Sequence, residues 1–121
     1  MELGLNLDTL LLFNTHIHMY VLIYLSQTHL TAPYYEERDE LIQRLRLTVM
    51  GTFQLPPSPN RFSSTHLLDK GHFTLHYSPR TSTARIDLFY DDPLFNPAEA
   101  IHAVQQVFRT DHIQYQILHG L

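Results

Sequence analysis

The sequence has no cysteine, which excludes disulfide bonds, thiolate metal sites and cysteine nucleophiles. Basic residues are scarce: 8 Lys and Arg stand against 12 Asp and Glu, and the formal charge of -4 gives no electrostatic surface for nucleic acid. Long apolar runs are also missing, because Asn14, His16 and His18 interrupt residues 10–25, and no Lys or Arg precedes them. This pattern argues against a signal peptide or a membrane span. We therefore expect a cytoplasmic protein that binds neither nucleic acid nor membrane.

The rest of the composition is that of an ordinary globular domain. With 121 residues, 44% of them hydrophobic, the chain can bury one core but cannot divide into two domains. We expect a single domain over residues 1–121, with residues 1–9 as an arm outside the core. The 9 histidines are many for this length, and most are expected to be surface or core residues without a chemical role.

Hydrophobic periodicity predicts short strands and two helices. The expected strands cover residues 10–25, 47–55, 61–68, 71–78, 84–90 and 113–117, and the expected helices cover residues 34–47 and 96–108. For residues 10–25 a buried helix competes with the strand. In the second strand Val49 and Phe53 are expected on one face, with Gly51 marking a bulge. The second helix has the clearest start, because Asn96 supplies an N-cap and Pro97 fits the first helical position.

These elements predict an α+β fold, a two-layer sandwich in which a mainly antiparallel sheet carries two helices on one face. A hairpin of residues 71–78 and 84–90 forms its centre. In the first of these strands Phe73, Leu75 and Tyr77 alternate with His72, Thr74 and His76. Arg85 and Asp87 continue the polar series on the second strand. This polar face is expected to form a pocket or to meet a second subunit.

The same hairpin resembles the prokaryotic S-adenosylmethionine decarboxylases, small pyruvoyl enzymes of spermidine synthesis. Residues 70–80 read KGHFTLHYSPR and residues 84–91 read ARIDLFYD, which follow the family pattern ESHxSIHTWPE and then AxVDxFxC without a gap. Ser63 falls where the family has a second serine involved in self-processing. The resemblance covers most of the chain, is most specific over residues 59–108, and implies an S-adenosylmethionine decarboxylase-like sandwich.

The departures from the family pattern bear on function. In these enzymes a serine rearranges and the chain is cleaved, leaving the pyruvoyl group that forms a Schiff base with the substrate. Gly71 occupies this position and has no hydroxyl, so we expect neither chain cleavage nor a pyruvoyl cofactor. Asp91 replaces the catalytic cysteine, and Arg80 replaces an acidic residue. Of the usual machinery, Ser63 and His76 remain.

The resemblance implies a site for S-adenosylmethionine or a relative. We expect catalytic roles for His76, Asp91 and Ser63. Substrate-binding roles are expected for His72, Asp69, Gly71, Phe73 and Tyr90, because carboxylates and aromatic faces suit a sulfonium cation. Cleavage to methylthioadenosine and homoserine lactone is physically possible on this scaffold without a cofactor, because the carboxylate of the substrate can displace methylthioadenosine intramolecularly.

Other interpretations stay open. The chain is expected to be a homo-oligomer, first of all a dimer, but a catalytically inactive regulatory or metabolite-sensing paralogue would instead pair with an active decarboxylase subunit. Two His-x-Thr triplets, at His29 and His72, are typical of two-histidine phosphoesterases. His16 with His18, and His72 with His76, share strand faces as metal ligands do, but no fixed third ligand accompanies either pair, so we expect no metal.

Overall fold

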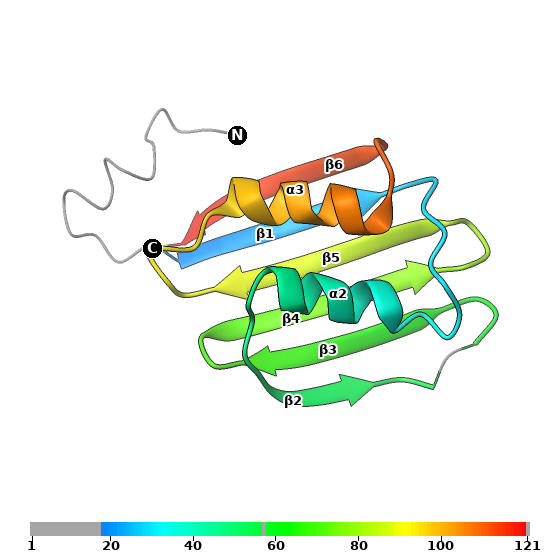
Figure 1. The fold of residues 1–121 in the computed structure, drawn as a ribbon, viewed down its shortest axis with the longest axis horizontal. Coiled ribbons are helices and arrows are strands. Elements are labelled where there is room, and N and C mark those ends of the chain that lie inside the picture. The colour runs from blue at the N-terminus through cyan, green and yellow to red at the C-terminus, as the bar shows by residue number, and fades with distance from the viewer. Residues whose placement is uncertain (1–17, 57, 121) are drawn as a thin grey trace.

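The structure, a computed structural model, describes residues 18–56 and 58–120 (Figure 1). The elements in these residues are β1 (His18–Leu25), α2 (Glu36–Arg44), β2 (Val49–Gln54), β3 (Phe62–Leu68), β4 (Gly71–Ser78), β5 (Thr83–Tyr90), α3 (Pro97–Phe108) and β6 (Ile113–Gly120). This is the expected order of strands and helices. The expected arm over residues 1–9, and the first part of the strand expected over residues 10–25, lie outside the described residues.

The strands form one sheet in the order β2-β3-β4-β5-β1-β6, with each neighbouring pair antiparallel. Both helices lie on the same face of this sheet (Figure 1). The expected α+β sandwich is therefore confirmed, as is a strand rather than a helix for the described part of residues 10–25. No described helix is long and apolar enough to cross a membrane.

The core lies between the sheet and the helices, because every second residue of the central strands points to the helical layer. On β4 the core residues are Phe73, Leu75 and Tyr77, and on β5 they are Ala84, Ile86 and Leu88. Helix α3 contributes Ile101, Val104, Val107 and Phe108 from its apolar stripe. The apolar alternation of the sequence thus predicts the buried face of the hairpin correctly.

The helices differ from expectation mainly at their ends. Helix α2 is shorter than residues 34–47, because Tyr34 and Arg46 adopt left-handed backbone angles, with φ of 79° and 55°. Within α2, Nη2 of Arg44 lies 3.1 Å from Oε2 of Glu40. Helix α3 begins as expected: the side chain of Asn96 accepts a hydrogen bond from the main-chain N–H of Ala98 at 3.0 Å.

Strand β2 contains the bulge that Gly51 indicated, since the pairing with β3 shifts between Val49 and Gly51. Val49 pairs with Leu68 of the core face, whereas Phe53 pairs with Thr65 of the opposite face. The expectation that Val49 and Phe53 share a face is therefore wrong. An extra residue in one strand moves all later side chains of that strand to the other face.

Candidate functional site

The sheet face away from the helices carries three rows of side chains that cross the strands. The first row runs Ser63, His76, Arg85, Tyr24 and Gln114 from β3 to β6, and the second runs Thr65, Thr74, Asp87, Leu22 and Gln116. The third row consists of Leu67, His72, Phe89, Tyr20 and Leu118. Neighbouring rows lie about 7 Å apart, because they are two residues apart along each strand. We call this surface the open face.

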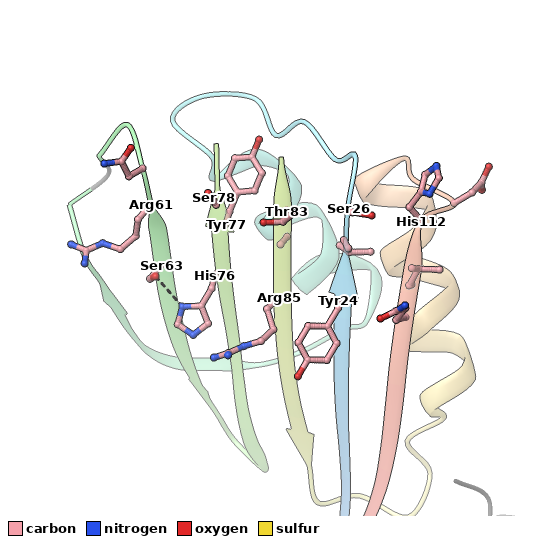
Figure 2. Close-up of a pocket in the computed structure, with 16 residues that line it drawn as sticks. Tyr24, Ser26, Arg61, Ser63, His76, Tyr77, Ser78, Thr83, Arg85 and His112 are labelled. Carbon is pink, nitrogen blue, oxygen red and sulfur yellow. Dashed lines mark hydrogen bonds between the residues drawn. The ribbon is translucent and has the colours of Figure 1, made fainter. Parts of the chain in front are cut away.

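A groove of about 850 Å³ follows the first row at the end of the sheet where β4 ends and β5 begins. Figure 2 shows Ser63, His76, Arg85 and Tyr24 side by side along it, each from a different strand. Arg61 and His112 also line the groove, together with several hydroxyl groups. This volume lies within the range of sites for small organic ligands, about 300 to 1,000 Å³.

Ser63 and His76 form a hydrogen-bonded pair in the groove. Oγ of Ser63 lies 2.9 Å from Nδ1 of His76, as the dashed line in Figure 2 shows. Partial burial lowers the pKa of His76 below its ordinary value, and the positive charge of Arg85 lowers it further. At neutral pH this imidazole is therefore uncharged, and Arg85 supplies the positive charge of the row.

Arg85 and Asp87 form an ion pair between the first and second rows. Nε of Arg85 lies 3.5 Å from Oδ1 of Asp87, and the side chain of Arg85 is 48% exposed whereas that of Asp87 is 17% exposed. At 3.5 Å this contact is not a hydrogen bond, and no group among the described residues donates one to that buried oxygen. A buried carboxylate oxygen without a donor is costly, so Asp87 is a candidate binding group for a ligand that carries hydrogen-bond donors.

Three rings of the third row form an aromatic cluster beside Asp87. The ring centroids of His72 and Phe89 are 5.7 Å apart, those of Tyr20 and Phe89 are 6.0 Å apart, and those of Tyr20 and His72 are 5.8 Å apart. Burial, and then the negative charge of Asp87, raise the pKa of the Tyr20 hydroxyl. The cluster thus stands within the electrostatic influence of the carboxylate.

Gly71, the first residue of β4, is closely approached by the main chain of β5. A Cβ atom at this position would lie 1.9 Å from the carbonyl oxygen of Phe89 and 2.8 Å from its carbonyl carbon. Real Cβ atoms do not approach this closely, and a main-chain neighbour cannot rotate away as a side chain can. The local backbone therefore requires glycine at position 71.

The structure separates the residues that the sequence suggested for one site. Ser63 and His76 lie in the groove, whereas Gly71 is five residues from His76 along β4, about 17 Å away in an extended strand. Asp91 follows β5 at the Gly71 end, where its main-chain N–H donates to the carbonyl oxygen of Lys70 at 2.8 Å. Within this chain, Asp91 does not line the groove.

The substrate-binding residues expected near Gly71 also lie on different faces of the sheet. Phe73 is fully buried on the helical side and stacks on His66, with ring centroids 5.5 Å apart, so the expected contact with a ligand is wrong for this residue. Tyr90 faces the same side, packs on Phe95, and donates a hydrogen bond from its hydroxyl to Oδ1 of Asp69 at 3.2 Å. Of this group, His72 belongs to the open face.

The two His-x-Thr triplets do not form a joint site. Nδ1 of His29 lies 3.2 Å from Oγ of Ser82, which precedes β5, whereas His72 pairs with Phe89 near the opposite end of that strand. Phe89 lies six residues beyond Thr83 in this strand, a distance of about 20 Å. The two-histidine phosphoesterase interpretation is therefore wrong on geometry. Within residues 18–56 and 58–120, no group of three or more His, Asp or Glu residues could hold a metal ion.

Comparison with known proteins identifies the family. The sequence profile described as S-adenosylmethionine decarboxylase matches residues 31–119, well over half of the chain. The chain belongs to the S-adenosylmethionine decarboxylase family. The fold agrees with the crystal structure of the adenosylmethionine decarboxylase from Aquifex aeolicus: the TM-score is 0.72 at 15% sequence identity, over 85% of this chain and 89% of that one. A search of curated proteins found no matching sequence.

The pyruvoyl group implied by the resemblance does not fit the residues at position 71. The group arises from a serine, and Gly71 has neither the hydroxyl nor the space for a Cβ atom beside Phe89. The sequence pattern identifies Ser63, His76 and His72 as site residues. It does not indicate Arg61, Tyr24 and His112, because these lining residues come from segments far apart in the sequence and carry no shared local pattern.

Proposed function

We propose that this member of the S-adenosylmethionine decarboxylase family binds S-adenosylmethionine on its open face and cleaves it, without decarboxylation, to methylthioadenosine and homoserine lactone. The observation that carries the proposal is the contact between Gly71 and the main chain of Phe89. It leaves the family scaffold without a position for the pyruvoyl group. The proposed reaction on the same substrate needs no pyruvoyl group, because it uses groups that the substrate itself supplies.

The chemistry of the open face supports binding of such a substrate. S-adenosylmethionine carries a sulfonium, an ammonium and a carboxylate, and the open face offers the Asp87 carboxylate, the Arg85 guanidinium and the aromatic cluster of Tyr20, His72 and Phe89. Cations bind favourably over aromatic rings and beside carboxylates. The groove adjoining these groups is large enough for a nucleoside.

The proposed reaction needs no cofactor and no proton transfer. One carboxylate oxygen attacks the γ-carbon of the methionyl group, a C–O bond forms as the C–S bond breaks, and the bonding electrons pass to sulfur. The products are neutral methylthioadenosine and a lactone that keeps its ammonium group. Because the attack is already intramolecular in the free substrate, the protein contributes by holding the methionyl chain in the conformation that brings the two reacting atoms together. Opposite charges disappear in this step, so surroundings less polar than water favour it.

Product analysis tests the proposal. The purified protein is incubated with S-adenosylmethionine, and mass spectrometry is expected to find methylthioadenosine and homoserine lactone in equal amounts, well above a protein-free control. Decarboxylated S-adenosylmethionine is the matched control substrate, because it lacks the attacking carboxylate and should stay intact. Carbon dioxide release would contradict the proposal. Binding without turnover would favour the regulatory or sensing paralogue instead.

We assign Ser63 and His76 a positioning role in this reaction, with the neutral imidazole fixed by the serine hydroxyl. Because no proton moves, His76→Asn is expected to lower kcat by less than about 10-fold and to leave the shape of the dependence of kcat on pH unchanged between pH 6 and 9. A general base would instead contribute about 100- to 10,000-fold. Steady-state kinetics across this pH range measures the difference. A larger loss, with the disappearance of a pH-dependent limb, would contradict the positioning role.

We also propose that two copies pair through the open face. This face leaves Phe53 70% exposed, Leu67 61% exposed and Tyr24 45% exposed, although the centre of its second row, Thr74, Asp87 and Leu22, is buried or half-buried. Pairing would exclude water from the rows, as the proposed reaction requires. Light scattering of the purified protein is expected to give twice the monomer mass. Copurification of a second, cleaved decarboxylase chain would contradict the homodimer and support the regulatory interpretation.

A further inference from the structure

We infer that Arg85 and Asp87 together recognise the α-amino-acid head group of the ligand, with the guanidinium on its carboxylate and the Asp87 carboxylate on its ammonium. This inference rests on the proposed function, because it deepens the account of how S-adenosylmethionine is held. It goes beyond that function by separating recognition of the head group from recognition of the nucleoside.

The geometry of the pair matches a zwitterion. The two side chains come from alternate residues of β5 and point to the same face, so their charges stand next to each other between the first and second rows. An α-amino acid carries its two opposite charges on one carbon atom. A positive and a negative group held side by side are therefore complementary to it.

The hydrogen bonds of Asp87 indicate that the Arg85–Asp87 pair lacks a donor that a ligand could supply. Oδ1 of Asp87 is buried, yet the nearest positive group, Nε of Arg85, stays at 3.5 Å and makes no hydrogen bond to it. An ammonium group of the ligand has three donors and would complete the hydrogen bonds of this carboxylate, whose side chain is 17% exposed. A purely structural ion pair would be expected to close this distance to about 2.8 Å.

The four side chains that lie opposite Arg85 and Asp87 on the neighbouring strands do not balance the charges of this pair. Across β4, Arg85 is opposite His76 and Asp87 is opposite Thr74; across β1, they are opposite Tyr24 and Leu22. None of these four side chains brings a second full charge to the pair at neutral pH. The half-exposed guanidinium is accessible from the groove, where the rest of the ligand would lie.

Three unreactive ligands separate the contributions of the head group. S-adenosylhomocysteine has both the carboxylate and the ammonium, decarboxylated S-adenosylhomocysteine has only the ammonium, and methylthioadenosine has neither; all three are neutral thioethers at sulfur. Calorimetry with the full-length protein gives the three dissociation constants. Because a hydrogen bond to a charged group contributes about 1.5 to 3 kcal/mol, each lost contact is expected to weaken binding about 10- to 100-fold.

Two variants assign these contacts. Arg85→Gln is expected to weaken the binding of S-adenosylhomocysteine about 10- to 100-fold and the binding of the other two ligands less than about 2-fold. Asp87→Asn is expected to weaken the binding of S-adenosylhomocysteine and of decarboxylated S-adenosylhomocysteine, but not that of methylthioadenosine. Arg80→Gln, which removes an exposed positive charge from the turn between β4 and β5, is the matched control and should change none of the constants. Thermal melting verifies that each variant is folded.

The outcomes distinguish this inference from the proposed function. Equal effects of Arg85→Gln on all three ligands, or none, would overturn the head-group assignment while leaving nucleoside binding intact. The wild-type order of affinity is a test that does not depend on folding of a variant: equal affinity for the three ligands would also overturn the assignment. If the wild type binds none of them, both the inference and the proposed function fail.

Discussion

Gly71→Ser is expected to lower the free energy of unfolding by about 3 kcal/mol and to leave the chain uncleaved. The new Cβ atom would lie 1.9 Å from the carbonyl oxygen of Phe89, so β4 and β5 would have to move apart where they are paired. Overpacking of this kind typically costs about 1 to 3 kcal/mol, and here the obstructing atoms are main chain. Chemical denaturation measures the loss, and intact mass measures cleavage.

Two further glycine variants separate the effect of the Cβ atom from that of the hydroxyl. Gly71→Ala is expected to destabilise as much as Gly71→Ser, since the clash arises from the Cβ atom that both share. Gly51→Ala is the matched control: no atom lies within 4 Å of a Cβ there, so the change should stay below about 0.5 kcal/mol. Two fragments from Gly71→Ser, split before residue 71, would contradict the claim that this position cannot form a pyruvoyl group.

Acid is expected to destabilise the fold through His66. This imidazole is 2% exposed, stacks on Phe73, and lies 3.0 Å from Oγ1 of Thr52 through Nδ1 and 3.1 Å from Oγ of Ser64 through Nε2. Burial, and then the positive charge of Arg38, lower its pKa from 6.5 to about 4, against a small opposite effect of Asp39. The unfolded chain, with the ordinary pKa, therefore takes up the proton first.

The sign of the pH effect follows from these two pKa values. The stability that neutral His66 contributes is fully present above pH 6.5 and is lost as the pH falls towards 4. Between pH 7.5 and pH 5 the loss is about 2 kcal/mol. Urea denaturation at each pH measures it, and NMR titration of the His66 ring tests the pKa directly. A His66 titration midpoint near 6.5 in the folded protein would contradict the prediction.

His66→Gln is expected to reduce this pH dependence without abolishing it, because the pKa of His76 is lowered in the same direction. The slope of stability against pH is the decisive quantity, since it remains measurable even if the variant is less stable overall. His102→Gln, at an exposed position of α3, is the matched control and should keep the wild-type slope. An unchanged slope in His66→Gln would assign the acid sensitivity to other groups.

Much of the fold was predictable because it depends on local periodicity. The alternation in residues 71–78 and 84–90 identified the buried face of the hairpin, and the Asn96 cap located the start of α3, as observed. The bulge in β2 was indicated by Gly51, but its effect on Phe53 was not. Which strands become neighbours is a long-range property, and the position of β1 between β5 and β6 has no local signal.

The candidate site, like the fold, was predictable from the sequence only in part. The sequence identified His76 and Ser63, and register brought them within hydrogen-bonding distance. It also grouped Asp91 and Gly71 with His76, because the resemblance to the family pattern implies that the matching residues share one site. Within this chain, five residues of extended strand at about 3.3 Å each separate Gly71 from His76.

By itself the sequence determined the family motif, the order of the elements and glycine at position 71. Only the tertiary structure decided that this glycine is required, because the carbonyl oxygen of Phe89 that excludes a side chain comes from another strand. It likewise decided that Arg85 and Asp87 stand beside an aromatic cluster drawn from three strands. Contacts across a sheet depend on strand order and register, and these follow from packing of the whole chain rather than from any one segment.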